Sequence, residues 1–257
     1  MSLPKPANPV LNPSSPYAQH LLLMLPLTEG TGQPGVILGA DGVTAGAPSV
    51  TTWTASAGTW STNSDGTCLH QTGTNPLRIG TDSTSGAWLP TGDCTICVIR
   101  GRSGSFPSTG FWASGITTVG NTKAFSLLIP RNSGATRWQY GSASPLEAAL
   151  TAPYALDPPD ILVVTAGAAG RSIYKNGVLK NSSATPVTRT SDTTSLLLMN
   201  APETQDLNFF QIFGTQWDDA TVAAWSADPY VALYAATAHR SGFGAQKPSR
   251  RQQGRRV

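Results

Sequence analysis

The sequence predicts an all-β protein, an antiparallel jelly-roll sandwich with one short C-terminal helix and extended N- and C-terminal arms. Asn176-Gly177 stands between two alternating apolar runs, which is the strongest short-range signal for a two-residue hairpin because both turn residues need positive φ. Short apolar runs separated by Gly, Ser, Thr and Asn recur along the chain, as in sandwiches and jelly rolls. A single segment near the C-terminus has a helical pattern.

Three parts follow from this pattern. Residues 1–17 form a predicted arm, because their five prolines exclude a regular helix and favour extended backbone. Residues 18–236 form the predicted jelly-roll domain, and a chain of 257 residues is long enough to bury one large core. Residues 237–257 form a predicted basic tail.

The predicted strands are short and separated by turn residues. They cover residues 21–27, 50–54, 67–70, 94–100, 111–113, 124–130, 137–140, 161–165, 172–180, 195–200 and 207–214. In the hairpin 172–180, strict alternation predicts one dry face and one wet face. In 207–214 the alternation is imperfect, which indicates a strand that is buried on both faces or carries a bulge.

Cys94 and Cys97 have the spacing of a redox or zinc pair, but their flanks predict a strand. Residues three apart in a strand point to opposite faces, so the two sulfurs cannot converge on one metal. Three cysteines are also too few for a disulfide framework. We therefore expect small buried thiols and no metal site.

The helix is predicted over Ala220–Ser226. Asp218 and Asp219 precede it, where a carboxylate accepts hydrogen bonds from unpaired amides and favours the positive end of the helix dipole. Pro229 ends it. Val222 and Trp225 share one face, which we expect to lie on the sandwich.

The tail separates charge from the rest of the chain. It holds six of the seventeen Lys and Arg residues and no acid, so the remaining residues have eleven bases, fourteen acids and a net charge of −3. Because the basic stretch from Lys247 to Arg256 has no interleaved aromatic residues, we expect it to bind acidic patches of a partner protein rather than nucleic acid. The predicted partner-binding residues are Lys247, Arg250, Arg251, Arg255 and Arg256.

Three parts of the chain resemble laminin G-like domains of the concanavalin A-like lectin and glucanase superfamily. The run Asn12-Pro-Ser-Ser-Pro-Tyr-Ala-Gln-His-Leu-Leu-Leu-Met-Leu-Pro-Leu-Thr-Glu-Gly-Thr-Gly32 is similar to their first strand. Asp160–Thr165 followed by Ile173–Val178 is similar to their hairpin, and Phe210–Gly214 with Trp217–Tyr230 to their last strand and short helix. The resemblance covers about residues 12–234.

The members with a similar opening motif are encoded by bacteriophages, so the resemblance implies a non-enzymatic virion structural protein. We expect a decoration, minor capsid or tail-associated protein that forms homo-oligomers and is made in the host cytoplasm. Arms of this composition are ordered only when they lie on something, so we expect them to bind neighbouring virion subunits. No apolar run approaches the length of a membrane span, and we expect no membrane association.

The same fold hosts enzymes, but the glucanase members require two glutamates and an aspartate alternating on one strand. The three glutamates, Glu29, Glu147 and Glu203, lie far apart and fit no such strand, so we expect no enzyme activity. Calcium is the cofactor that the fold would allow. The aspartates in loop-like contexts, Asp41, Asp82, Asp192 and Asp206, are better read as solvated turn residues, so we expect no cofactor.

The alternative function is a carbohydrate-binding adhesin that recognises host-surface glycans. Tryptophan rings serve lectins as platforms for sugars, although most tryptophans of a sandwich fill its core. Trp60 and Trp88 lie in turn-like contexts and are the predicted platforms.

Overall fold

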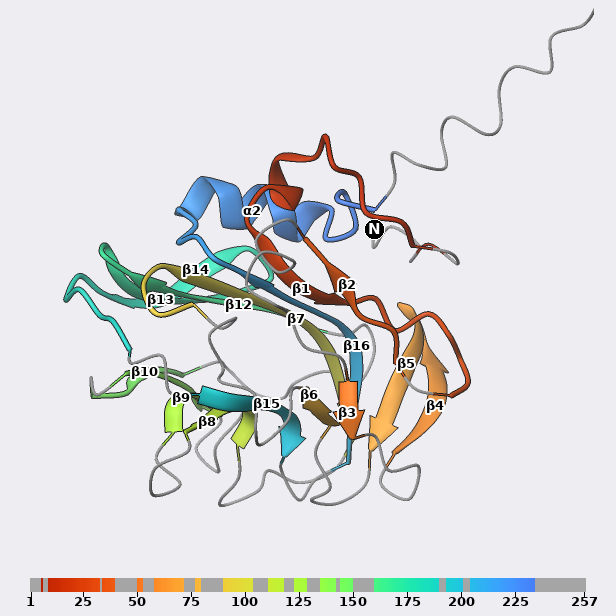
Figure 1. Cartoon of the computed structure of the whole chain (residues 1–257). Helices are drawn as coiled ribbons and strands as arrows, with labels where there is room; N and C mark the ends of the chain where they lie inside the picture. Colours follow the sequence, from red (N-terminus) through yellow and green to blue (C-terminus); the bar gives the residue numbers. More distant parts are fainter. Residues whose placement is uncertain are drawn as a thin grey trace, which may run out of the picture.

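The structure is a computed structural model, and it describes residues 6, 9–32, 34–39, 50–52, 58–71, 77–79, 90–103, 111–117, 123–128, 135–141, 144–149, 160–189, 193–200 and 204–233. In this part of the chain two antiparallel sheets face each other and one helix lies on the outside (Figure 1). The predicted all-β sandwich with a short C-terminal helix is therefore confirmed.

The first sheet, sheet A, has the strand order β14-β13-β12-β7-β16-β1-β2, with β5 also paired to β16 and β4 paired to β5. Its strands are β1 (Leu21–Leu25), β2 (Ile37–Leu38), β4 (Gly58–Asn63), β5 (Gly66–Gln71), β7 (Cys94–Ser103), β12 (Asp160–Gly167), β13 (Gly170–Lys175), β14 (Val178–Ser183) and β16 (Thr204–Phe213). Strands β7, β12 and β16 lie at its centre.

The second sheet, sheet B, has the strand order β11-β10-β9-β8-β15-β6-β3. Its strands are β3 (Val50–Thr52), β6 (Leu77–Ile79), β8 (Phe111–Thr117), β9 (Lys123–Leu128), β10 (Ala135–Tyr140), β11 (Leu146–Ala149) and β15 (Thr193–Asn200).

The two sheets enclose the main hydrophobic core. Val98 of β7, Leu196 of β15 and Trp138 of β10 are fully buried members of this cluster. The Trp138 indole also donates a hydrogen bond of 3.0 Å from Nε1 to the carbonyl oxygen of Thr165 in β12. This bond joins the two sheets and satisfies the one polar atom of the ring.

A second hydrophobic cluster covers the outer face of sheet A. Helix α2 (Asp219–Ala227) turns Val222 and Trp225 onto the sheet, and both are fully buried, as predicted. Trp217, just before the helix, packs between Phe213 and Trp225, with ring centroids 4.3 and 6.0 Å away. No helix of the described residues is long and apolar enough to cross a membrane.

The residues before β1 pack on this same outer cluster. Leu11 and Tyr17 contact it, and the Asn12 backbone N–H donates to the carbonyl oxygen of Ala232 at 2.6 Å. Pro16–Ala18 forms a short 3-10 helix, against the expectation that the prolines keep this segment free of helix. Proline is compatible with the first position of a helix because its missing N–H is not needed there. The proposed boundaries of arms and domain remain predictions.

The Asn176-Gly177 hairpin is confirmed, with φ of 51° and 77° at the turn and Lys175 paired with Val178. The expectation that the hairpin has one dry face and one wet face is wrong for β13. Ile173 lies in the inner core and Tyr174 in the outer cluster, so β13 is buried on both faces. The outer face is dry because α2 covers it. Strand β14 lies at the sheet edge and is exposed along most of its length.

Two further predictions hold. Cys94 lies in the inner core and Cys97 in the outer cluster, on opposite faces of β7, and both thiols are free. Burial raises the pKa of Cys94 to about 12. Strand β16 carries a bulge between Leu207 and Phe209 and is buried on both faces from Leu207 to Phe213.

Replacing Trp225 by alanine should lower the free energy of unfolding by about 3–5 kcal/mol, because it leaves a large cavity between α2 and sheet A. Urea denaturation measures this. Ala224→Ser, on the exposed side of the same helix, should change stability by less than about 0.5 kcal/mol. Equal effects of the two substitutions would contradict the assigned helix face.

Candidate functional site

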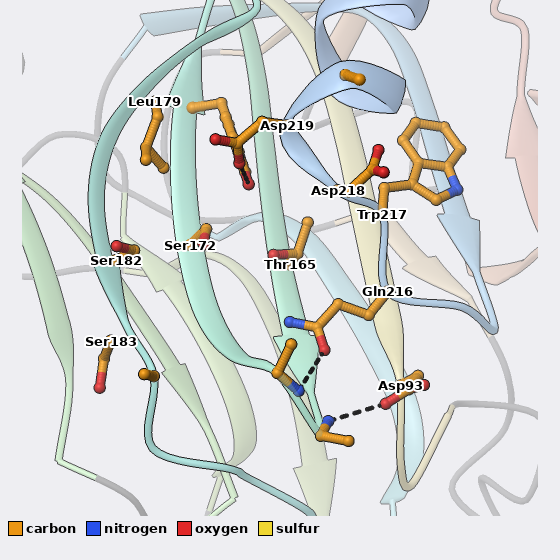
Figure 2. Close-up of a pocket in the computed structure, with 15 residues that line it drawn as sticks. Asp93, Thr165, Ser172, Leu179, Ser182, Ser183, Gln216, Trp217, Asp218 and Asp219 are labelled. Atoms are coloured by element: carbon orange, nitrogen blue, oxygen red, sulfur yellow. Dashed lines mark hydrogen bonds between the residues drawn. The ribbon is translucent and has the colours of Figure 1, made fainter.

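An open pocket of roughly 770 Å³ lies where the β13–β14 hairpin, the β12–β13 turn and the start of α2 meet (Figure 2). This volume is within the usual range of ligand sites, about 300–1,000 Å³. Polar side chains and alanines line the pocket together. The larger or polar side chains in its lining include Asp93, Thr165, Ser172, Tyr174, Leu179, Ser182, Ser183, Gln216, Asp218 and Asp219.

Two side chains from distant segments fix the β12–β13 turn at the floor of the pocket. Asp93 Oδ1 accepts a hydrogen bond of 3.0 Å from the backbone N–H of Ala168. Gln216 Oε1 accepts one of 3.0 Å from the N–H of Ala169, and its Nε2 donates to the carbonyl oxygen of Gly170 at 3.0 Å. The dashed lines in Figure 2 show the two bonds to the turn. The turn therefore has little freedom to move.

Gly167 permits this arrangement. Its φ of 153° is one that residues with a side chain rarely adopt. A Cβ at this position would also lie 2.1 Å from Asp93 Oδ1 and 2.7 Å from Gln216 Oε1. Both contacts are too short, so any larger residue would displace the two side chains that hold the turn.

The start of α2 forms the opposite rim. Asp218 is the N-cap and accepts a hydrogen bond of 2.8 Å at Oδ1 from the N–H of Thr221. Hydrogen bonding by Thr221 lowers the pKa of the Asp218 carboxyl. Asp219 Oδ1 accepts a hydrogen bond of 2.8 Å from the Tyr174 hydroxyl. Burial raises the pKa of Tyr174 to about 12, so this phenol is a stable donor at neutral pH.

Hydroxyl groups line the wall between floor and rim. Thr165 lies on β12 and is 1% exposed. Ser172 and Ser182 add hydroxyls from β13 and β14, and the exposed side chain of Leu179 provides an apolar edge.

The predicted sugar platform Trp60 does not lie in this pocket. Trp217 borders it, but its ring is turned away from Ser172 and Ser182 and packs edge-on against Tyr17 at 5.3 Å (Figure 2). Trp60 lies on β4, several strands away in sheet A. Its Nε1 donates to the Gly32 carbonyl oxygen at 3.0 Å, and its ring packs against the inner core.

The other predicted site residues lie outside the described residues. They are Trp88, Lys247, Arg250, Arg251, Arg255 and Arg256. Their roles in sugar and partner binding remain predictions.

The aspartates considered for calcium do not form a site in the described residues, where no group of three or more His, Cys, Asp or Glu side chains could hold a metal ion. The sequence context of Asp206 suggested a loop, but the residue lies within β16. Asp41, Asp82 and Asp192 lie outside the described residues, as does Glu203.

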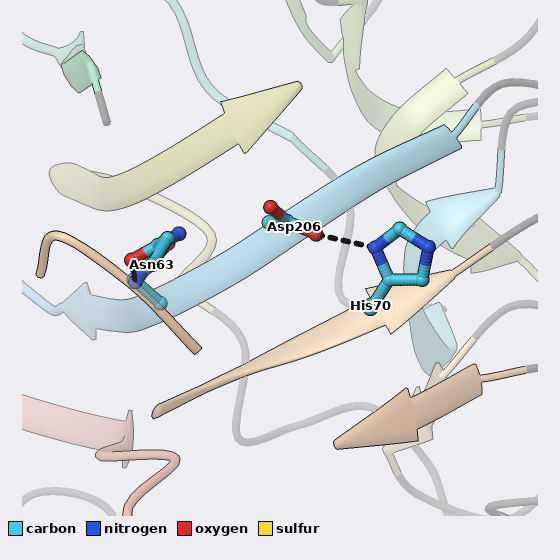
Figure 3. A network of polar contacts seen from close by, with 4 residues as sticks. Asn63, His70 and Asp206 are labelled. Carbon is cyan, nitrogen blue, oxygen red and sulfur yellow. Dashed lines mark hydrogen bonds and ion pairs between the residues drawn. The ribbon is translucent and has the colours of Figure 1, made fainter. Parts of the chain in front are cut away.

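A second polar cluster joins β5 to β16 at the far end of sheet A (Figure 3). His70 and Asp206 face each other in register, with 2.7 Å between Nδ1 and Oδ1. Asn63 and Asn208 exchange two side-chain hydrogen bonds of 3.0 and 2.7 Å at the β16 bulge. These contacts link neighbouring strands, so they explain how the β4–β5 hairpin is held and do not require a ligand.

Comparison with known proteins identifies the fold but no family. No protein-family model matches the chain, and no curated protein matches it in sequence. The botulinum neurotoxin serotype D ligand binding domain in complex with N-acetylneuraminic acid is similar in structure, with a TM-score of 0.59 and 11% identity over 82% of this chain and 51% of that chain. Trypanosoma rangeli sialidase in complex with 2,3-difluoro-KDN has a TM-score of 0.57 and 14% identity over 88% of this chain and 36% of that chain.

The chain therefore spans about half or less of the length of these structures, and at such identity the likeness concerns the fold alone. It contradicts the prediction that the protein is not an enzyme. The fold also occurs in sialidases, which are enzymes, so it gives no ground for excluding catalysis. Neither protein named here is a virion protein, so the laminin G-like resemblance is supported only as a β-sandwich and the bacteriophage role has no support.

Sequence reasoning missed this pocket because its residues are far apart in the chain. A local signal existed in Gly167-Ala168-Ala169-Gly170, where two glycines flank two small residues between strand patterns. Asp93 and Gln216 gave no signal, since their partners are backbone groups 75 and 47 residues away in sequence.

Gly167→Ala should lower the free energy of unfolding by about 1–3 kcal/mol, because it strains the backbone and displaces Asp93 and Gln216. Gly92→Ala is the matched control, since a Cβ there would meet no atom within 4 Å, and it should cost less than about 0.5 kcal/mol. Urea denaturation compares them. A Gly167 variant as stable as the control would show that the turn does not depend on these contacts.

Proposed function

We propose that the protein binds carbohydrate and that the pocket between the β13–β14 hairpin and α2 is the binding site. The observation that carries the proposal is the convergence of hydroxyls and carboxylates from β12, β13, β14, the residue before β7 and the start of α2.

The chemistry of these groups suits a sugar. A sugar hydroxyl both donates and accepts hydrogen bonds, so it pairs well with serine and threonine hydroxyls, which do the same. Carboxylates accept stronger, charge-assisted hydrogen bonds from such hydroxyls. Asp93 and Asp219 each use one oxygen to hold the protein, and no other hydrogen bond to either occurs among the described residues. Leu179 offers an apolar contact to the C–H face of a ring.

The comparisons support the same class of ligand. The botulinum neurotoxin domain and the sialidase are each in complex with an acidic sugar, N-acetylneuraminic acid and 2,3-difluoro-KDN. They support carbohydrate binding better than a structural role in a virion. The likeness does not transfer a site, because the identity is 11% and 14%.

A glycan array with the full chain tests the proposal. Ser182→Leu, which fills the pocket from its exposed wall, should reduce binding to the best glycan at least tenfold. Ser61→Leu makes the same change at an exposed serine of β4, away from the pocket, and should leave binding unchanged.

Two outcomes would contradict the proposal. The array shows no glycan bound above background, or the Ser182 and Ser61 variants bind equally well. Thermal unfolding of both variants confirms that they remain folded, so that lost binding is not lost structure.

A further inference from the structure

The charge of the pocket points to a narrower class of ligand than the fold does. We infer that the pocket selects neutral or cationic sugars and rejects sialylated ones, an inference that rests on the proposed carbohydrate binding. Its ligands differ in charge from the acidic sugars bound to the botulinum neurotoxin domain and the sialidase.

Three aspartates line the pocket, Asp93 at its floor and Asp218 and Asp219 at its rim. Among the described residues that line it, none is lysine, arginine or histidine, so the lining carries a formal charge of −3. Proteins bind the carboxylate of an acidic ligand with such cationic side chains, above all arginine. The pocket offers neutral serine hydroxyls instead.

The two cationic side chains of β13, Lys175 and Arg171, are directed elsewhere. Lys175 pairs with Asp160 at the tip of the hairpin, 3.1 Å from Nζ to Oδ2. Arg171 is buried, and its Nη1 donates to the carbonyl oxygen of Ser144 at 2.6 Å. Lys180 is exposed on β14 next to Leu179 but does not line the pocket.

The helix end that faces the pocket cannot take the anion either. The N-terminus of a helix normally attracts negative groups through its unpaired N–H groups and its dipole. In α2 the Asp218 carboxylate already accepts from the N–H of Thr221, and Asp219 adds a second negative charge in the first turn. An incoming carboxylate would therefore meet two like charges at a helix end where the N–H of Thr221 is already taken.

The backbone donors at the floor are also occupied. The N–H groups of Ala168 and Ala169 would form an anion site if they were unpaired, but Asp93 and Gln216 accept from them. A neutral sugar hydroxyl does not need unpaired N–H groups, because it can donate a hydrogen bond to the carboxylates. An amino sugar gains further, since its ammonium group pairs with them directly.

The test compares glycans that differ only by a terminal N-acetylneuraminic acid, before and after its enzymatic removal, on the full chain. In about 0.1 M salt the sialylated form of a bound glycan should bind at least tenfold more weakly. In 1 M salt the difference should shrink, since the screening length falls from about 10 Å to about 3 Å.

Asp219→Asn should raise binding of the sialylated form and affect the neutral form less, because the amide oxygen still accepts from Tyr174. Glu29→Gln removes one charge far from the pocket and should not alter the preference. Equal or stronger binding of sialylated glycans, lost in Ser182→Leu, would overturn this inference and leave the proposed function standing. Absence of binding to any glycan would overturn both.

Discussion

The packing of aromatic rings on the outer face of sheet A is the interaction on which the rest of the site depends. Trp217 and Trp225 lock the start of α2 against Phe213 of β16. Gln216 directly precedes Trp217 in the chain, and Asp218 and Asp219 directly follow it. Because the packing of Trp217 fixes the positions of these neighbours, Gln216 reaches the β12–β13 turn and Asp219 reaches Tyr174. If the aromatic cluster were loosened, the start of α2 would move away from the strands that form the other side of the pocket.

The same bonds that shape the pocket also preorganise it. Asp93 and Asp219 each hold the protein with one oxygen, and Gln216 holds the turn through both of its polar atoms. These side chains are already held in one conformation before a ligand binds. Less conformational entropy is therefore lost on binding.

Sequence reasoning succeeded where a signal is local. The Asn176-Gly177 turn, the opposite faces of Cys94 and Cys97, and the buried face of α2 each follow from spacing within a few residues. It failed where another element decides the outcome. Tyr174 looked like a residue of one face of a half-exposed hairpin, but α2 covers that face. The strands β2, β6 and β11 contain two to four residues and have too short a pattern to be recognised.

The candidate site escaped prediction for a further physical reason. Its side chains come from residues 93 to 219, and only the pairing of β12 with β7 and of β7 with β16 brings their ends together. Such pairing fixes where loops converge, so proteins of the same fold share the position of their clefts more readily than their contents. The sandwich therefore fixes where the pocket lies, whereas the three aspartates set its charge. Since these two properties depend on different residues, a chain can keep the sandwich and still differ from its structural neighbours in the ligands that its pocket accepts.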